Sequence, residues 1–108
     1  MAITYNPNFA EASNNLGNAF HEIGKLESAI AAYESAISTN SNYAEAYYNM
    51  ANALQGLGDL WQAIEAYQNA IDIKPDYAEA FHNMGSAFQD EGKMDQAKEA
   101  YNNAIVYK

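Results

Sequence analysis

Residues 44–77 read AEAYYNMANALQGLGDLWQAIEAYQNAIDIKPDY, and closely similar stretches lie on both sides. Residues 10–43 and 78–108 align with this stretch without a gap, at an offset of 34 residues each time. Residues 2–9 match the tail of a preceding unit. A fixed period of this length is typical of proteins built from stacked supersecondary units. We therefore expect a single domain over residues 1–108, with repeats at 10–43, 44–77 and 78–108.

The pattern within each repeat predicts two helices joined by a tight turn. In the middle copy, apolar residues recur at helical spacing between residues 46 and 57, and again between 60 and 71. Gly58 separates the two halves, and glycine is the residue best suited to a left-handed helix cap. Pro75 ends the copy because proline cannot continue a helix. Small residues recur where two helices must approach closely, at Gly17, Ala51 and Gly85, at Ala29, Ala63 and Ala97, and at Ala36, Ala70 and Ala104.

These recurring Leu-Gly, Ala, Gly, Ala, Tyr, Ala and Pro positions resemble the tetratricopeptide repeat, and the resemblance covers the entire chain. It implies an all-α fold, an α-solenoid of three helix–turn–helix repeats that form a right-handed superhelix. The first helix of each repeat would line a concave face, and the second helices would lie outside. Repeats of this kind stabilise one another mainly through contacts between nearest neighbours.

The composition excludes several classes of function. Of the 108 residues, 49% are hydrophobic, none is cysteine, and the net charge is −9. There are five lysines and no arginine, which argues against binding to nucleic acid or to anionic membranes. The N-terminus does not read as a secretory signal, and no apolar run is long enough to span a bilayer. We therefore expect a cytoplasmic protein.

Residues that could support catalysis or bind a metal are scattered. His21 and His82 lie two repeats apart, too far for one metal site. Ser13 and Ser86 have no His–acid partners in the pattern, and GLGD at residues 56–59 lacks the Lys-Ser/Thr of a phosphate loop. We expect no enzymatic activity, no metal and no cofactor.

The resemblance implies which side chains face the concave side, and hence where a partner would bind. The eighteen positions that it assigns to this side, six in each repeat, include no Lys or Arg, and five of them are acidic: Glu11, Glu22, Glu45, Glu79 and Asp90. A protein or peptide partner, basic in character, would suit such a groove. The peptide-binding residues that we expect are Asn14, Asn15, Asn18, Glu45, Tyr48, Asn49, Asn52, Glu79, His82 and Asn83.

One concave position is asparagine in all three repeats, at Asn15, Asn49 and Asn83. A side-chain amide offers both donors and an acceptor, so it can pair with a peptide backbone whatever its sequence. The row resembles the asparagine ladder in the repeat array of the O-linked N-acetylglucosamine transferases. The alternative is that these asparagines cap or pack within their own hairpins.

A second binding mode in this family is the carboxylate clamp, which holds the acidic C-terminal tails of heat-shock chaperones. The clamp needs cations where this chain has Asn14, Glu79 and Asn83. Charge-assisted bonds to a terminal carboxylate would be lost, and Glu79 would repel it. We therefore expect no affinity for such tails.

Four further positions carry structural expectations. Tyr43 and Tyr77 are expected to pack between repeats. Trp61 occupies a position that is usually polar. Two alternatives stay open for its side chain: partial exposure on the convex side, or packing against the neighbouring hairpin. Glu91 and Lys98 replace apolar residues of the earlier repeats, which predicts partial capping of the last one.

Three hypotheses for function follow. The first is a protein–protein interaction module that binds a peptide segment in an acidic, Asn-lined groove. The second is the substrate-recruiting array of a larger enzyme such as a glycosyltransferase. The third is a structural or engineered unit that self-associates end to end, because Ile105, Val106 and Tyr107 leave apolar surface at the end of the chain. A plain monomer with a frayed last helix is the alternative to the third.

Overall fold

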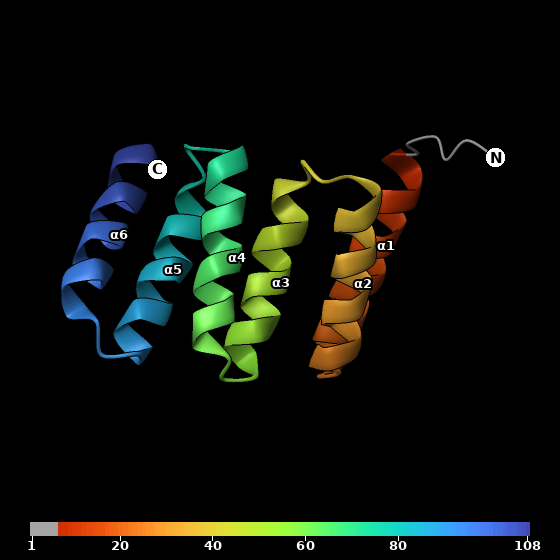
Figure 1. The fold of residues 1–108 in the computed structure, drawn as a ribbon, viewed down its shortest axis with the longest axis horizontal. Helices are drawn as coiled ribbons and strands as arrows, with labels where there is room; N and C mark the ends of the chain where they lie inside the picture. Colours follow the sequence, from red (N-terminus) through yellow and green to blue (C-terminus); the bar gives the residue numbers. More distant parts are fainter. Residues whose placement is uncertain (1–6) are drawn as a thin grey trace.

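The computed structural model describes residues 7–108, which form six helices and no strand. Figure 1 shows the helices side by side, with α1 and α6 at opposite ends. The expected all-α solenoid of three helical hairpins is confirmed. In chain order the helices are α1 (Pro7–Glu22), α2 (Leu26–Thr39), α3 (Ala44–Gly56), α4 (Leu60–Ile73), α5 (Ala78–Asp90) and α6 (Met94–Tyr107).

Contacts between helices follow the order of the chain. The hairpins pair α1 with α2, α3 with α4, and α5 with α6, while α2 packs on α3 and α4 packs on α5. The first helices also meet, because α3 contacts both α1 and α5. Among the described helices no other pair is in contact, so the stability of the stack depends on nearest neighbours.

The turn inside each hairpin depends on a glycine. Gly58 has a φ of +83°, a conformation that costs glycine little because it has no Cβ. The Gly58 N–H donates to the Gln55 carbonyl, and the Asp59 N–H donates to the Leu54 carbonyl, both at 2.9 Å. This pair of bonds satisfies carbonyls that the end of α3 would otherwise leave unpaired. The glycines at the corresponding places in the other repeats have the same conformation, as expected.

Two other glycines allow the helices of a hairpin to touch. A Cβ added to Gly17 would lie 2.4 Å from Cε1 of Tyr33, and one added to Gly85 would lie 2.9 Å from Cδ1 of Tyr101. Both distances are shorter than any ordinary carbon–carbon contact. The close helix approach expected from the small residues at these positions is therefore confirmed.

The core is built around buried tyrosines. Tyr33 and Tyr67 have no exposed surface, and each belongs to a buried cluster that contains alanines of its own hairpin and of the next one. The Tyr33 hydroxyl donates to Oδ1 of Asn18 at 2.6 Å, and the Tyr67 hydroxyl donates to Oδ1 of Asn52. Burial raises the pKa of Tyr33 to about 12 and raises that of Tyr67 as well. A buried tyrosine thus links the core to polar side chains on the first helix.

The N-terminal end differs from the expected tail. Helix α1 begins at Pro7, whereas α3 and α5 begin at Ala44 and Ala78, the equivalents of Ala10. Residues 7–9 are therefore the first turn of α1 here, and the rest of the expected tail, residues 2–6, lies outside the described residues. Proline suits the first position of a helix because it lacks an N–H that would be unpaired there anyway. The repeat boundaries themselves stay a prediction.

One of the two expected capping substitutions is wrong. Glu91 occupies a position where Ile23 and Leu57 are already 68% and 47% exposed, so it does not replace a buried residue. Its Oε1 lies 3.6 Å from Nζ of Lys93. Lys98 is exposed at a position where the earlier repeats have half-buried isoleucines, which fits its expected role.

Candidate functional site

All ten residues expected to bind a peptide lie on the first helices, α1, α3 and α5. Because α3 contacts both of the others, these residues form one continuous row along the solenoid. The surface that they define is called the inner face below. Its members are Asn14, Asn15 and Asn18 on α1, then Glu45, Tyr48, Asn49 and Asn52 on α3, then Glu79, His82 and Asn83 on α5.

The asparagine at the recurring position of the second repeat bonds to the repeat before it. Nδ2 of Asn49 donates to Oδ1 of Asn14 at 3.1 Å. Asn14 is 4% exposed, so this bond satisfies a buried acceptor. Asn14 therefore belongs to the junction between the first two repeats and offers little surface to a partner.

The corresponding asparagine of the third repeat behaves in the same way. Nδ2 of Asn83 donates to the Tyr48 hydroxyl and to Oδ1 of Asn52, both at 3.0 Å. Oδ1 of Asn52 also accepts the Tyr67 hydroxyl, so this network joins α3, α4 and α5. These asparagines bridge consecutive repeats, an arrangement that differs from capping within one hairpin.

A third bridge lies further along the same helices and was missed from the sequence. Nε2 of Gln55 donates to Oγ of Ser86 at 3.2 Å and to Oδ2 of Asp90 at 3.3 Å. The sequence does carry a signal for such bonds. The bonded polar pairs 14/49, 48/83 and 55/90 are each 35 residues apart, one more than the repeat period.

The bridges leave part of each amide available. Within residues 7–108, Oδ1 of Asn49 and Oδ1 of Asn83 accept no hydrogen bond. Asn15 is exposed and has no side-chain hydrogen bond in the same range. An amide that is held through its nitrogen and has a free oxygen can accept an N–H from another chain.

A shallow hollow lies where the inner face crosses α1. Its volume is about 520 Å³, and its lining residues are Asn15, Asn18, Ala19, His21 and Glu22. Oδ1 of Asn18 accepts the Tyr33 hydroxyl, which leaves the two N–H groups of Asn18 to donate. The side-chain amides of the inner face are most accessible here.

Negative charge collects where α3 and α5 meet. Glu45 and Glu79 are both exposed, at equivalent positions of the two helices. Burial raises the pKa of Tyr77 above its ordinary value, and the nearby Glu45 and Glu79 carboxylates raise it further. The ion pair between Lys93 and Glu91 is the only one in the described part of the chain, so neither inner-face carboxylate is paired with a cation.

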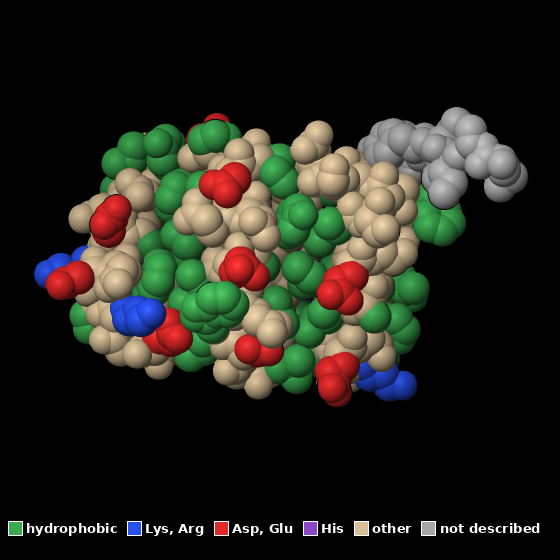
Figure 2. Space-filling view, viewed as in Figure 1, with side chains coloured by type: hydrophobic (Ala, Val, Ile, Leu, Met, Phe, Trp, Pro, Cys, Tyr) green, Lys and Arg blue, Asp and Glu red, His purple; other side chains and the backbone are tan. Residues whose placement is uncertain are grey.

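The aromatic residues divide between core and surface. Tyr77 is 6% exposed and belongs to a buried cluster that includes residues of α4 and α5, so its expected packing between repeats is confirmed. Tyr43 is half-buried. Trp61 on α4 is 65% exposed, which confirms partial exposure, and it borders a hollow of about 250 Å³ between α2 and α4. In Figure 2 acidic side chains are spread over α2, α4 and α6, while basic ones lie near the two ends of the solenoid.

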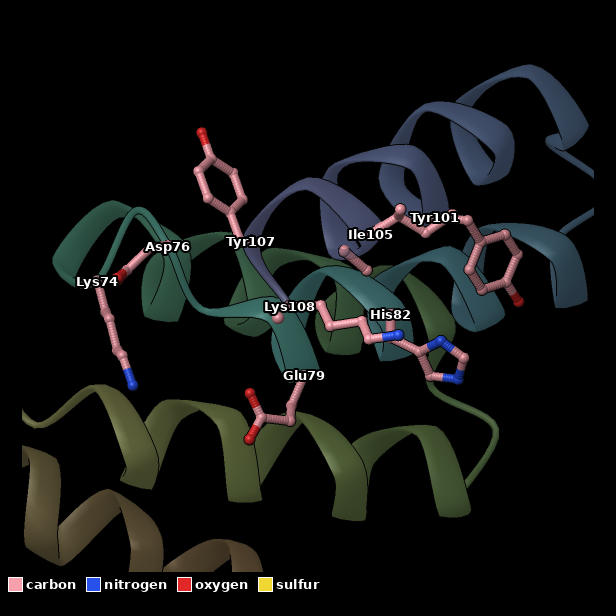
Figure 3. Close-up of a pocket in the computed structure, with 10 residues that line it drawn as sticks. Lys74, Asp76, Glu79, His82, Tyr101, Ile105, Tyr107 and Lys108 are labelled. Atoms are coloured by element: carbon pink, nitrogen blue, oxygen red, sulfur yellow. The ribbon is translucent and has the colours of Figure 1, made fainter.

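Another hollow lies at the C-terminal end of the solenoid, with a volume of about 720 Å³. Figure 3 shows that Glu79 and His82 of α5 and Tyr101 and Ile105 of α6 border it. Its lining residues are Lys74, Asp76, Ala78, Glu79, His82, Tyr101, Ala104, Ile105, Tyr107 and Lys108.

Within residues 7–108 no three His, Asp or Glu side chains come together in a way that could hold a metal ion. His21 lies on α1 and His82 on α5, with α3 between them. No described helix has the length and apolar character needed to cross a bilayer.

Comparison with protein families gives matches along the chain. A family model described as TPR repeat matches residues 17–58 and 57–92. Two models described as Tetratricopeptide repeat match residues 1–31 and 79–106. No curated protein sequence matches the chain.

Solved structures share the fold. A crystal structure of MamA is 34% identical, with a TM-score of 0.89, over 94% of this chain and 60% of MamA. The chain thus spans about 60% of the MamA chain. A structure described as the second TPR of Spaghetti (RPAP3) bound to HSP90 peptide SRMEEVD is 26% identical, covers 94% of both chains and has a TM-score of 0.91. The Arabidopsis OM64 TPR domain, at 24% identity, covers 94% of this chain and 84% of its own, with a TM-score of 0.92, and shares the fold.

Proposed function

Because the chain belongs to the tetratricopeptide repeat family, we propose that it is a protein-interaction module whose inner face binds a basic, extended peptide segment of a partner. A neighbour of the same fold is described with a bound peptide, which supports this class of function. The observation that carries the basic character is the pair of exposed carboxylates at Glu45 and Glu79, on adjacent helices and without a cation partner in the described residues.

Charge favours such a ligand in two ways. The protein carries a net charge of −9, so a basic segment is attracted from a distance. At close range, Glu45 and Glu79 can each form a charge-assisted bond with a Lys or Arg side chain, and such bonds are stronger than neutral ones. None of the ten inner-face residues is a Lys or Arg that would compete for these carboxylates.

The side-chain amides would hold the peptide backbone. Oδ1 of Asn49 and Oδ1 of Asn83 are available to accept backbone N–H groups, and the N–H groups of Asn18 are available to donate. The bonds between repeats fix the orientation of these amides before a ligand arrives, which lowers the entropic cost of binding. Backbone recognition of this kind sets few limits on peptide sequence, so charge would provide the selectivity.

The same face disfavours acidic tails. Of the three positions that the carboxylate clamp would need to be cationic, Asn14 is buried, Glu79 is an exposed acid, and the N–H groups of Asn83 are already used. A terminal carboxylate would therefore meet repulsion and no positive charge. The acidic peptide SRMEEVD serves as a counter-ligand in the test below.

Fluorescence anisotropy with labelled peptides tests the proposal. The ligands are an extended peptide of alternating Lys and Ser, the same peptide with Glu in place of Lys, and SRMEEVD. We expect the basic peptide to bind at least about tenfold more tightly than either acidic one, and its affinity to fall as salt screens the charges. Equal affinities for all three peptides would contradict the proposal.

A pair of matched variants locates the site. Glu45→Gln/Glu79→Gln removes two exposed charges from the inner face, and Glu27→Gln/Glu99→Gln removes two exposed charges from the second helices. Both variants change the net charge equally, so long-range attraction falls by the same amount. We expect the first variant to weaken binding of the basic peptide several-fold more than the second. An equal effect of both would place the peptide elsewhere.

A further inference from the structure

The hollow of about 250 Å³ between α2 and α4 lies at the junction of the first two hairpins, so neither end of the chain forms it. Its residues differ in exposure. Leu54 of α3 is buried and Met50 is half-buried, whereas Glu34, Trp61 and Glu65 are exposed. The hollow therefore has an apolar base and a rim that carries one indole and two carboxylates. The name outer hollow is used for this surface below.

The fold does not require an aromatic residue at the rim. The residues equivalent to Trp61 in the first and third repeats are Glu27 and Asp95, and both are exposed. Trp61 keeps 65% of its surface exposed, so it contributes little to the core. Tryptophan is among the residues that contribute most to binding at protein interfaces. A partner can therefore contact this indole without disturbing the packing of the helices.

The next junction has a similar hollow with different chemistry. It lies between α4 and α6 and has a volume of about 200 Å³. Gln68 lines it at the position equivalent to Glu34, and an exposed acid, Asp95, stands at the position equivalent to Trp61. The combination of an indole with two carboxylates is thus particular to the outer hollow and does not follow from the repeat.

The two rim carboxylates have no cation partner. The one ion pair among residues 7–108 joins Lys93 and Glu91, so neither Glu34 nor Glu65 is paired. No described Lys lines the outer hollow, and Figure 2 shows basic side chains near the two ends of the solenoid. Trp61 and Glu65 are four residues apart on α4, a spacing that places two side chains next to each other on one face of a helix. A cation stacked on the indole would therefore lie beside a carboxylate.

We propose that the outer hollow binds an arginine side chain that a partner protein presents. A guanidinium is planar, stacks on an indole and donates paired hydrogen bonds to carboxylates, whereas a lysine ammonium is a strongly hydrated point charge. The apolar stem of the arginine would lie on Ile30, Met50 and Leu54, which also line the hollow.

Size and composition narrow the occupant further. The volume of about 250 Å³ is below the ~300–1,000 Å³ that is usual for small-molecule pockets, which favours a single side chain over a whole ligand. This chain contains no arginine, so a second copy cannot supply the side chain. The inference does not depend on peptide binding at the inner face, which is formed by other helices.

Fluorescence tests the inference directly, because Trp61 is the only tryptophan and its emission reports on this site alone. The probe is a capped peptide, Gly-Ser-Arg-Ser-Gly, and its counterparts carry Lys or the neutral isostere citrulline in place of Arg. We expect the Arg peptide to protect Trp61 from acrylamide in a saturable way. It should bind at least about fivefold more tightly than the citrulline peptide and more tightly than the Lys peptide. Equal protection by the Arg peptide and by either counterpart would overturn the inference.

Matched variants separate the rim carboxylates from the total charge. Glu34→Gln/Glu65→Gln removes the two rim charges, and Asp95→Asn/Glu99→Gln removes two exposed charges from α6. Both variants change the net charge equally, and all four residues are exposed, so each variant should fold as the parent does. We expect the first variant to weaken binding of the Arg peptide several-fold and the second to change it by less than about twofold. An equal effect of both would overturn the inference.

Trp61→Gln tests the indole, with fluorescence anisotropy of a labelled Arg peptide as the measurement. Any binding of this peptide at the inner face contributes equally to the parent chain and to the variant, so the difference between them isolates the outer hollow. We expect Trp61→Gln to bind the Arg peptide several-fold more weakly. Unchanged binding would mean that the indole takes no part, and the inference would be wrong. Circular dichroism of each variant confirms that it is folded.

Discussion

Nδ2 of Asn49 donates a hydrogen bond to Oδ1 of Asn14, 3.1 Å away on the preceding repeat. The acceptor is buried. The donor belongs to the row of asparagines whose sequence pattern predicts binding to a peptide backbone. The bond gives Asn49 a structural role without using its Oδ1. The same side chain can therefore fix the distance between two repeats and present an acceptor on the inner face.

Asn49→Ala should destabilise the protein. The change leaves the buried Oδ1 of Asn14 without its donor, and such a loss costs about 1–3 kcal/mol. Urea denaturation followed by circular dichroism measures this. The control is Asn15→Ala, at the equivalent position of the first repeat, where the side chain is exposed. We expect this control to change the free energy of unfolding by less than about 0.5 kcal/mol.

A double-mutant cycle with Asn14→Ala and Asn49→Ala tests the bond itself. Once either partner is absent, removing the second should cost less, so the double variant should lose less than the sum of the two single losses. Additive losses would mean that each asparagine acts through other contacts.

Gly17→Ala should also destabilise the protein. The added Cβ would lie 2.4–2.9 Å from three atoms of the Tyr33 ring, which has no exposed surface and therefore little room to move. Ala51 occupies the equivalent position of the second repeat, so a hairpin of this kind can adjust to a methyl group. We expect a loss of about 1–3 kcal/mol in free energy of unfolding, the usual range for overpacking.

Gly56→Ala is the matched control for that change. Gly56 is also helical, but the only atom near its added Cβ is the end of the flexible Leu26 side chain, at 3.0 Å. Alanine favours a helix over glycine by about 1 kcal/mol, so this variant should be neutral or more stable. A clear loss at Gly56 would show that helix contact is not what distinguishes the two glycines.

Stability should fall in alkaline solution. Burial raises the pKa of Tyr33 from 10.0 to about 12 and raises those of Tyr67 and Tyr77 as well. Above pH 10 the unfolded chain releases tyrosine protons that the folded chain still holds, so unfolding becomes easier as pH rises. Below pH 10 both states hold these protons and the stabilisation is complete. Each tyrosine should lower the free energy of unfolding by up to ~1.4 kcal/mol per pH unit above that point.

Urea denaturation at several pH values between neutral and strongly alkaline measures this slope. Tyr33→Phe should make the alkaline slope shallower, because the phenylalanine has no proton to lose. An unchanged slope in Tyr33→Phe would mean that Tyr33 does not carry the effect.

Trp61 should behave as a surface residue. It is the only tryptophan and is 65% exposed, so its fluorescence should be quenched by acrylamide almost as efficiently in the folded as in the unfolded protein. Trp61→Gln should change the free energy of unfolding by less than about 0.5 kcal/mol. Strong protection from acrylamide would show that the indole is covered in solution.

The sequence determined the architecture of this protein because the architecture depends on short-range features that recur in every repeat. Helical periodicity, the turn glycine at Gly58 and the small residue at Gly17 each act within one hairpin, so their meaning can be read from spacing alone. Repetition at 34 residues then requires that identical hairpins pack in the same way. The first turn of α1 at Pro7 escaped this reasoning, because the match to the end of a repeat did not reveal that the segment is helical.

Only the tertiary structure decided which inner-face residues are accessible. Asn15, Asn49 and Asn83 occupy the same position of the repeat, yet Asn15 is exposed and the other two donate to the preceding repeat. Whether an amide meets a neighbour depends on the distance between two hairpins, and that distance results from packing over their whole contact. Likewise, Ile71 and Ile105 occupy equivalent positions but differ in exposure, because α5 packs on Ile71 and no described helix packs on Ile105 in the same way. The sequence of a single repeat does not encode this difference.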